Sequence, residues 1–562
     1  MRFQRTVQVL SLLVFVLLLF FAAELAARNI PADIFLRLSP FIALSVMIAG
    51  RMIIPGLFVS LILLGVSLVF GRFFCAYLCP FGTTIDCLDW LAISRVKRRP
   101  VKHPDQLRKS KYYILAFLAV SSLFSLILIH AFDPIALSTR IYTFLVYPLG
   151  VSAVNLALDI FRPLASRLNW VKLSVTRFPP IVFTANLATF LILAAIVALN
   201  VFQTRFWCRN LCPLGALLSL VSRFGFLKRK VGEGCTDCFQ CRNQCPMSAI
   251  EEDPRRTRIE ECIQCRHCVR VCPEKVVSFR PVSPFKKRET VYTAQTHLSR
   301  RVFLLSAVSA TATGFIAYSH PSRLLRNPDL IRPPGSIPEE EFLDTCIRCG
   351  SCMRVCITNT LQPCSVETEV RSLWSPRLVQ RLAACEATCN RCGQVCPTQA
   401  IRRLPLEEKI MAKIGTAYID RRRCLAWEQD RLCLICDEQC PYDAIELIDF
   451  EGLKRPIVYE HKCSGCGMCE SKCPVEGRSA IVVLPIGEVR LKEDSYIQEA
   501  GRLNLDLKLV EKTPFPGAIK IQALSLEDLG LEPDNLPPLP PGFITDQELE
   551  MMERKKDQEK AR

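Results

Sequence analysis

The segments CTDCFQCRNQCP at Cys235–Pro246 and CIQCRHCVRVCP at Cys262–Pro273 decide how this chain folds. Both have the spacing Cys-x2-Cys-x2-Cys-x3-Cys-Pro. Three thiolates at that spacing can bind three corners of a 4Fe-4S cluster, while the fourth, before proline, binds the partner cluster. Zinc and disulfides are weaker alternatives, because zinc sites use cysteine pairs rather than such triplets. The spacing predicts one cluster on Cys235, Cys238, Cys241 and Cys272, and another on Cys262, Cys265, Cys268 and Cys245.

Four more motifs of this kind follow between Glu339 and Pro485. Their cysteines are Cys346, Cys349, Cys352 and Cys356; Cys385, Cys389, Cys392 and Cys396; Cys424, Cys433, Cys436 and Cys440; and Cys463, Cys466, Cys469 and Cys473. The first motif has Ile357 in place of proline, and the second and third have a wider first gap. The spacing predicts four further 4Fe-4S clusters, six in all. Sequential pairing of the motifs (first with second, third with fourth) and nested pairing both satisfy the count.

Apolar residues are concentrated before residue 203, which indicates a membrane part followed by soluble parts. We expect spans at Val7–Ala27, Ile53–Phe70, Tyr112–Ile129 and Ile181–Phe202. Two other apolar stretches, Phe41–Gly50 and Ile141–Leu158, are expected to be membrane-surface or re-entrant segments. The run at Val7–Ala27 is longer than the apolar region of a signal peptide, so we interpret it as the first helix.

An internal repeat lies within this membrane part: GRFFCAYLCPFG at Gly71–Gly82 matches TRFWCRNLCPLG at Thr204–Gly215. Basic residues are dense beside both copies, as in loops on the cytoplasmic side. An even number of spans between the copies brings Cys75, Cys79, Cys208 and Cys212 to that same side. Four convergent thiolates could bind a metal or act as redox dithiols, although cysteine and proline could also simply shape a turn.

A fifth span is expected at Val302–Tyr318, preceded by the twin arginines Arg300 and Arg301. A short buried or amphipathic helix is the alternative. The predicted fold is an α-helical multi-pass membrane domain with α+β bacterial-type ferredoxin modules. Its parts are a membrane domain (1–230), a cytoplasmic two-cluster ferredoxin (231–285), a linker with the fifth span (286–320), a periplasmic four-cluster ferredoxin (321–485) and a C-terminal extension with a charged tail (486–562).

Composition excludes several classes of function. The formal net charge of +17 comes from basic residues beside apolar spans, which indicates membrane orientation rather than nucleic-acid binding. The chain has no Cys-x2-Cys-His motif and only six histidines, so we expect no haem. Of the thirty cysteines, the six motifs and the repeat leave only Cys87 and Cys364, and Cys364 is expected to be inert.

The first 280 residues resemble the NapH and NosR family of membrane polyferredoxins, through FCAYLCP, WCRNLCP and the two-cluster ferredoxin. Residues 299 to 485 resemble the exported four-cluster ferredoxins of the NapG and MauM family, through the twin arginines, CIRCGSCMRVC and CSGCGMCESKCP. The chain is similar to a fusion of the two, without the flavin-attachment domain of NosR-type proteins, so we expect no flavin. The resemblance implies an inner-membrane quinol dehydrogenase that passes electrons from the quinol pool to a periplasmic cytochrome or reductase.

Six clusters favour electron transfer over chemistry on a bound substrate. An accessory factor that supplies electrons for maturing a periplasmic metalloenzyme is one alternative. Another, if Val302–Tyr318 does not span, is a cytoplasmic ferredoxin-linked quinone reductase. Weak candidates for handling the quinol protons are Glu24, His130 and Asp133, which are expected near the outer ends of helices.

Overall fold

A computed structural model describes residues 2–510 except 29, 94–97, 99–103, 129–130, 168–169, 172–174, 180, 185, 283–298, 320–329 and 366–369. All of these residues belong to one compact unit. The candidate His130, most of the predicted linker and the charged tail lie outside the described residues.

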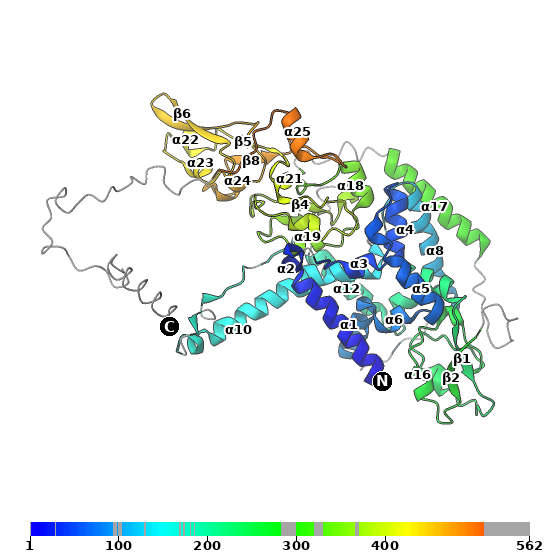
Figure 1. Ribbon diagram of the computed structural model, residues 1–562. Helices are drawn as coiled ribbons and strands as arrows, with labels where there is room; N and C mark the ends of the chain where they lie inside the picture. The colour runs from blue at the N-terminus through cyan, green and yellow to red at the C-terminus, as the bar shows by residue number, and fades with distance from the viewer. Residues whose placement is uncertain are drawn as a thin grey trace, which may run out of the picture. The chain divides into compact units, whose positions relative to one another are not determined.

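Helices are the regular structure in the described part of the first 222 residues (Figure 1). The helices are α1 (Arg2–Phe20), α2 (Ala22–Ala27), α3 (Ile34–Arg37), α4 (Pro40–Ala49), η1 (Pro55–Leu57), α5 (Ser60–Phe70), α6 (Phe73–Tyr77), α7 (Pro80–Leu88), η2 (Asp89–Ile93), α8 (Pro104–Leu123), α9 (Pro134–Ile141), η4 (Tyr142–Val146), α10 (Tyr147–Arg167), α12 (Asn186–Leu199), α13 (Phe206–Asn210) and α14 (Pro213–Ser222).

Capping explains two of the starts: Ser39 Oγ accepts from the Ile42 amide before α4, and Asp133 Oδ1 accepts from the Ile135 and Ala136 amides before α9. Proline occupies the first position of both helices, where its missing N–H costs nothing.

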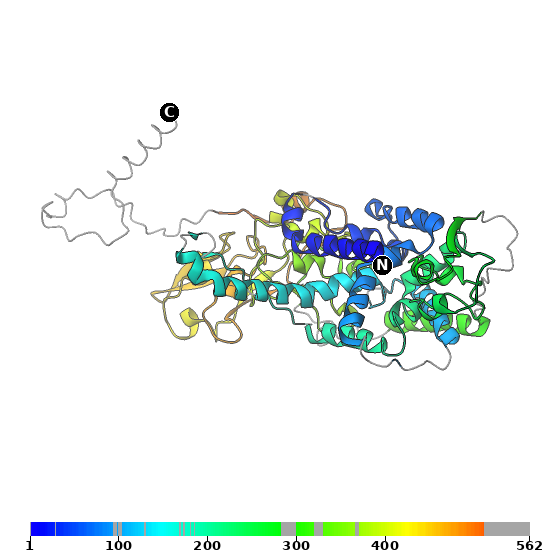
Figure 2. The same cartoon turned by 90° about the horizontal axis from the view of Figure 1, so that it is seen from below.

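Two described helices are long and apolar enough to cross a membrane, Phe3–Phe20 and Pro134–Arg167. The pair Pro55–Phe70 and Phe73–Ile93 adds a third if the two helices, bent by 95°, form one broken span. A span at the N-terminus was predicted, and helix α1 agrees with that prediction. For Ile141–Leu158 we predicted a membrane-surface or re-entrant segment, but the structure has the long apolar helix Pro134–Arg167 there. Its part α10 is a long straight helix in both views (Figures 1 and 2).

The other predicted spans contain helices, but these described helices are too short or too polar to cross a membrane. Ile181–Phe202 yields α12, with 14 residues. Tyr112–Ile129 lies partly in α8, which begins earlier and takes in charged residues such as Asp105 and Lys111. The predicted fifth span lies in α17 (Arg300–Ser319), whose many Ala, Ser and Thr residues lower its apolarity.

The first ferredoxin module is closed by β1 (Leu227–Val231) and β2 (Val277–Pro281), which pair antiparallel with Leu227 opposite Pro281. Between them lie α15 (Gln240–Asn243), η5 (Ile259–Glu261) and α16 (His267–Arg270). Because β1 begins at Leu227, the module starts slightly before the predicted boundary at 231. Each cysteine segment therefore forms a loop followed by one helical turn.

The C-terminal module contains three antiparallel two-stranded sheets. They pair β3 (Leu361–Pro363) with β4 (Pro376–Leu378), β5 (Thr416–Ile419) with β8 (Ile481–Leu484), and β6 (Ile445–Phe450) with β7 (Leu453–Val458). The helices are α18 (Glu339–Thr345), α19 (Ser351–Arg354), η7 (Val370–Ser372), α20 (Arg391–Gln394), α21 (Leu406–Ile410), α22 (Leu425–Glu428), α23 (Ile435–Glu438), α24 (Met468–Lys472) and α25 (Tyr496–Arg502). The module extends past the predicted end at 485, because Tyr496 and Leu507 are buried in its apolar clusters.

The two modules contact opposite ends of α1. Val7, near its start, packs against an apolar cluster that includes Met247 and Ile263 of the first module. Ala22 and Ala26, just past its end, pack with Val355 and Val395 of the C-terminal module. Helix α1 has 19 residues, which span about 28 Å at 1.5 Å per residue.

Candidate iron-sulfur sites and a four-thiol group

In the first module, the structure groups all four thiols of one predicted site and three of the four thiols of the other. Site A consists of Cys235, Cys238, Cys241 and Cys272, and site B of Cys262, Cys265, Cys268 and Cys245. The four thiols of site B line one cavity of about 370 Å³. In site A, Cys241 interacts electrostatically with Cys235 and Cys238, and Cys272 is partly buried.

The C-terminal cysteines form four groups, each a triplet joined by the last cysteine of a neighbouring motif. We name them site C (Cys346, Cys349, Cys352, Cys396), site D (Cys385, Cys389, Cys392, Cys356), site E (Cys463, Cys466, Cys469, Cys440) and site F (Cys424, Cys433, Cys436, Cys473). Cavities of about 360, 310 and 400 Å³ collect the thiols of sites D, E and F. In site C, Cys396 lies within electrostatic range of all three thiols of the triplet. This grouping is the sequential one, which the spacing alone left open against the nested one.

The thiol groups fit iron-sulfur clusters in their chemistry. Burial raises the pKa of the Cys466 thiol to about 12, and the nearby Cys440 and Cys463 add to the effect. Thiolates gathered at one site repel one another, and a bound metal centre would supply the positive charge that stabilises their ionised form. Among the described residues, no three His, Cys, Asp or Glu side chains lie close enough to bind a single metal ion.

Sites C to F follow one another in space. The Cys385 amide of site D donates to the Cys466 carbonyl of site E at 2.8 Å. The thiols of Cys385 and Cys466 interact electrostatically, as do Cys436 of site F and Cys469 of site E. Because sites C and D exchange cysteines, as do sites E and F, the order is C, D, E, F.

Three arginines hold the site C end of this series against the helices. Arg348 donates to the Ile127 carbonyl at 3.4 Å. Arg354 donates to the Phe20 carbonyl, and its guanidinium lies 3.4 Å from the centre of the Tyr147 ring. From the helical side, the guanidinium of the buried Arg140 lies 4.2 Å from the Trp374 ring. Cation–π contacts of this kind are strongest away from water. Site C therefore lies at the contact between the C-terminal module and the helices, to which Asn359 and Gln362 contribute as well by donating to the Val182 carbonyl.

The four thiols of the internal repeat come together, as the sequence predicted. Cys75 lies on α6 and Cys208 on α13, while Cys79 and Cys212 are the residues before α7 and α14. Cys79 and Cys212 have nearly the same backbone angles, φ −68° and −71°. All four thiols lie within electrostatic range of one another. Cys75 also packs into the same apolar cluster as three thiols of site B.

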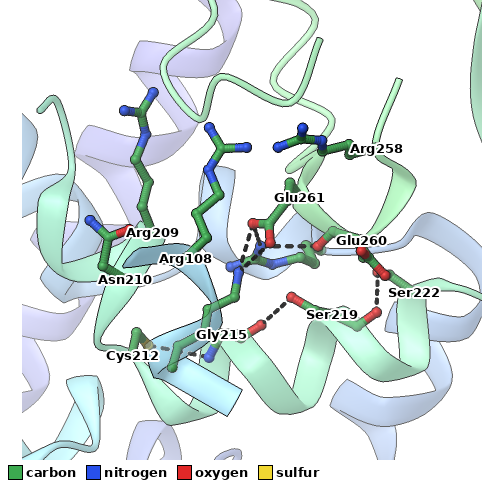
Figure 3. Close-up of polar contacts among 12 residues, drawn as sticks. Arg108, Arg209, Asn210, Cys212, Gly215, Ser219, Ser222, Arg258, Glu260 and Glu261 are labelled. Carbon is green, nitrogen blue, oxygen red and sulfur yellow. Dashed lines mark hydrogen bonds and ion pairs between the residues drawn. The ribbon is translucent and has the colours of Figure 1, made fainter. Parts of the chain in front are cut away.

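A buried ionic network joins these helices to the first module (Figure 3). Lys111 Nζ donates to both carboxylate oxygens of Glu261 at 2.7 and 2.6 Å, and Arg72 lies 3.2 Å from the same carboxylate. Burial opposes ionisation of Glu261, but the charges of Lys111 and Arg72 outweigh it and lower the pKa of that carboxyl. Figure 3 shows Glu261 facing the start of α14, where Cys212 lies. Arg72 interacts with Cys75 and Cys212 as well, so it lies between the four-thiol group and the residue preceding Cys262.

The proton candidates from the sequence lie in different surroundings. Glu24 is exposed on α2. Asp133 is fully buried, and both of its oxygens accept hydrogen bonds, from Ser39 Oγ at 2.9 Å and from two backbone amides. That geometry is typical of a helix cap.

Sequence reasoning missed Asp33, a buried acid before α3, because no motif contains it and its burial depends on distant helices.

Comparison with known proteins agrees with this arrangement. A family model described as a 4Fe-4S binding domain matches residues 52–100 and 185–232, the two copies of the repeat, and a 4Fe-4S dicluster domain matches 227–273. The methylamine utilization ferredoxin-type protein MauM of Methylorubrum extorquens is 37% identical over 164 residues, which are 28% of this chain and 72% of the relative. This chain belongs to the family of NapG- and MauM-type ferredoxins.

The family membership rests on a part of the chain. The ferredoxin-type protein NapG of Escherichia coli is 34% identical over 168 residues, again 28% of this chain and 71% of the relative. No solved structure matches the chain. Membership in the NapG and MauM family, together with the 4Fe-4S domains, makes the chain an iron-sulfur electron-transfer protein, and its N-terminal apolar helices are compatible with a fusion.

Proposed function

We propose that this chain is an inner-membrane quinol dehydrogenase, which carries electrons from membrane quinol through 4Fe-4S clusters to a periplasmic oxidoreductase. The observation that carries the proposal is the continuous series of sites C to F, whose first site contacts the ends of the apolar helices. A series of one-electron carriers that begins at a membrane surface suits a lipid-soluble donor and a soluble acceptor.

In this proposal the 24 cysteines of sites A to F are the iron ligands. The clusters supply one-electron transfer when bound. The chain buries most of these thiols at least in part, and the exchanged cysteines fix the order of sites C to F. The length of α1, about 28 Å, is close to the roughly 30 Å of a bilayer core, which supports modules on opposite membrane faces. By the basic residues the first module is cytoplasmic, and the C-terminal module is then periplasmic.

The four-thiol group next to site B belongs to the same proposal as a metal or redox site. Cys75 packs against the same apolar cluster as three thiols of site B, which supports electron exchange between the two sites. The match of both repeat copies to a 4Fe-4S binding domain favours an iron-sulfur centre over a dithiol pair. It would give the helical part a carrier of its own on the cytoplasmic side.

The test is reduction of the anaerobically purified full-length protein by a menaquinol analogue. We expect rapid loss of visible cluster absorbance and the appearance of the electron spin resonance signals of reduced clusters. If dithionite reduces the clusters while quinol leaves them oxidised, quinol oxidation by this chain is wrong. The maturation role would then be the better hypothesis.

A further inference from the structure

Two buried arginines occupy the same position in the two copies of the internal repeat. Arg72 stands three residues before Cys75, and Arg205 stands three residues before Cys208. Their side chains are only 1% and 3% exposed. A buried cation costs free energy unless negative groups lie near it. A buried arginine that recurs in both copies therefore indicates a negative group that both copies share.

Arg72 reaches from its own copy of the repeat to a thiol of the other copy. On one side its Nη1 donates to the Glu261 carboxylate at 3.2 Å. On the other side its Nη2 lies against Gly215, where an added Cβ would be 2.9 Å from Nη2 and 3.4 Å from Cys212 Sγ. Its Nε is buried and has no hydrogen-bond partner among the residues that the structure describes. One donor of this guanidinium is thus left without an acceptor from that part of the chain.

Arg205 makes the corresponding contacts with the first copy. Its Nε and Nη2 donate to the Asp86 carboxylate at 2.7 and 2.5 Å, and its Nη1 donates to the Cys75 carbonyl at 3.2 Å. Gly82 is the counterpart of Gly215 in the repeat. A Cβ added at Gly82 would be 3.4 Å from the Cys75 carbonyl oxygen and 3.9 Å from Arg205 Nη2. Each arginine therefore crosses to the opposite copy and lies beside the glycine of that copy.

Both guanidiniums lie within electrostatic range of the four-thiol group. Arg72 interacts with Cys75, and Arg205 interacts with Cys208. Arg205 also interacts with Cys265 of site B, so its charge acts on both sites. The thiols of the repeat are the negative group that the two arginines share.

The carboxylate partners do not cancel the charge of these arginines. Lys111 donates to both oxygens of Glu261, so with Arg72 there are two cations for one carboxylate. The Asp86 side chain is 38% exposed, whereas that of Arg205 is 3% exposed, so water screens the carboxylate more than the cation. Positive charge at a buried site stabilises negative charge more strongly than it would in water.

We propose that Arg72 and Arg205 are paired counter-charges of the iron-sulfur centre on the four thiols and raise its reduction potential. The inference rests on the proposed function, which assigns that centre to Cys75, Cys79, Cys208 and Cys212. One-electron reduction adds one negative charge to such a centre, and nearby positive charge stabilises the reduced form. The two arginines are positioning residues, because they act through charge and are not iron ligands.

The experiment is an anaerobic redox titration of the detergent-solubilised full-length protein with its clusters, followed by electron spin resonance. The signal of this centre is the one that the double variant Cys75→Ser, Cys208→Ser lacks. Arg72→Gln and Arg205→Gln, which remove the charge, are each compared with Arg72→Lys and Arg205→Lys, which keep it. Iron content is measured for every protein.

The control is Arg223→Gln. Arg223 pairs with the buried Glu260 carboxylate at 2.8 Å, but it follows α14 at the end opposite to Cys212. At the midpoint potential of the wild type, we expect each glutamine variant to lower the ratio of reduced to oxidised centre at least tenfold. For one electron this is a shift of about 59 mV. The lysine variants and the control should stay close to the wild-type ratio, and the signals of sites C to F should not shift in any variant.

The outcomes separate charge from packing and from the proposed function. Loss of the centre in the glutamine variants alone would also support the inference, because the lysine variants keep the charge. An unchanged potential in the glutamine variants, or equal effects of glutamine and lysine, would overturn it and leave the proposed function in place. If wild type and the cysteine double variant have the same iron content and signals, the four thiols hold no centre and the inference is wrong, whereas reduction of sites A to F by quinol tests the proposed function independently.

Discussion

At the scale of single residues, the C-terminal module depends on a buried charge triad. Arg332 and Arg490 each lie 2.6 Å from the Glu339 carboxylate, and the Glu339 side chain is only 8% exposed. Burial alone would raise the pKa of Glu339, but the hydrogen bonds and charges of the two arginines lower it below its ordinary value. The lowered pKa means that ionised Glu339 stabilises the folded state.

This pKa shift predicts how stability depends on pH. The stabilisation is fully present above the ordinary glutamate pKa of about 4.3, and it is lost as pH falls through the lower pKa of the folded state. At pH 7 we expect Glu339→Gln to cost about 3–5 kcal/mol, because it leaves a buried arginine without its charge partner. The measurement is the thermal loss of cluster absorbance between pH 7 and 3, where the difference between wild type and variant should shrink as pH falls.

The control for this prediction is Glu341→Gln. Glu341 forms a half-exposed ion pair with Lys492 at 3.0 Å, and such pairs contribute at most about 1 kcal/mol. Equal effects of the two variants, or a difference that does not change with pH, would contradict the triad's role.

The spacing of cysteines in the sequence predicted some of the candidate sites but not all of them. Cysteine spacing was enough to group the thiols of site B, because neighbouring motifs of this spacing exchange their fourth cysteine. It could not choose between sequential and nested pairing for sites C to F, since that depends on which motifs become neighbours in the fold. Asp33 was not predictable, because its burial arises only when α3, α9 and α19 pack together.

At the scale of elements, η5 and α8 hold the first module against the helices. Glu261 on η5 and Lys111 on α8 are both at most 1% exposed. We expect Glu261→Gln to loosen this contact, since it leaves Lys111 buried without a counter-charge. Hydrogen exchange followed by mass spectrometry should then show faster exchange in Leu227–Pro281 but not in the C-terminal module. The matched control is Glu233→Gln, an exposed acid of the same module, and similar exchange in both variants would contradict the prediction.

The second prediction at this scale concerns the four thiols of the internal repeat. They come from α6, α13 and the residues before α7 and α14. If they bind a 4Fe-4S cluster, the protein holds about 28 iron atoms per chain, against about 24 for six clusters. We expect the double variant Cys75→Ser, Cys208→Ser to lose about four iron atoms. Cys87→Ser changes an exposed cysteine outside every site and should lose none. Equal iron content in wild type and double variant would leave the four thiols as a dithiol pair or a structural feature.

Elements of the membrane part were predicted less well than the cysteine sites. A window of apolar residues cannot detect the sharp bend at Gly71, where φ is +61° and the chain turns by 95°. Such a window also did not predict that α9, η4 and α10 form one continuous helix. This helix contains Arg140, whose charge is buried against the Trp374 ring. Helix breaks and buried charges both come from tertiary contacts, which periodicity does not contain.

At the scale of the whole molecule, the proposed topology assigns the two modules to opposite membrane faces. Arg255 and Arg256 form an exposed turn of the first module, and Lys508 is exposed in the C-terminal module. Trypsin added to intact spheroplasts should therefore cleave at Lys508 and spare Arg255 and Arg256, and inverted membrane vesicles should give the reverse pattern. Arg255→Gln with Arg256→Gln should remove the cytoplasmic cut alone, which assigns each fragment. Cleavage at both places from the inner face would contradict the topology, because all sites would then be cytoplasmic and the chain would act as a ferredoxin-linked quinone reductase.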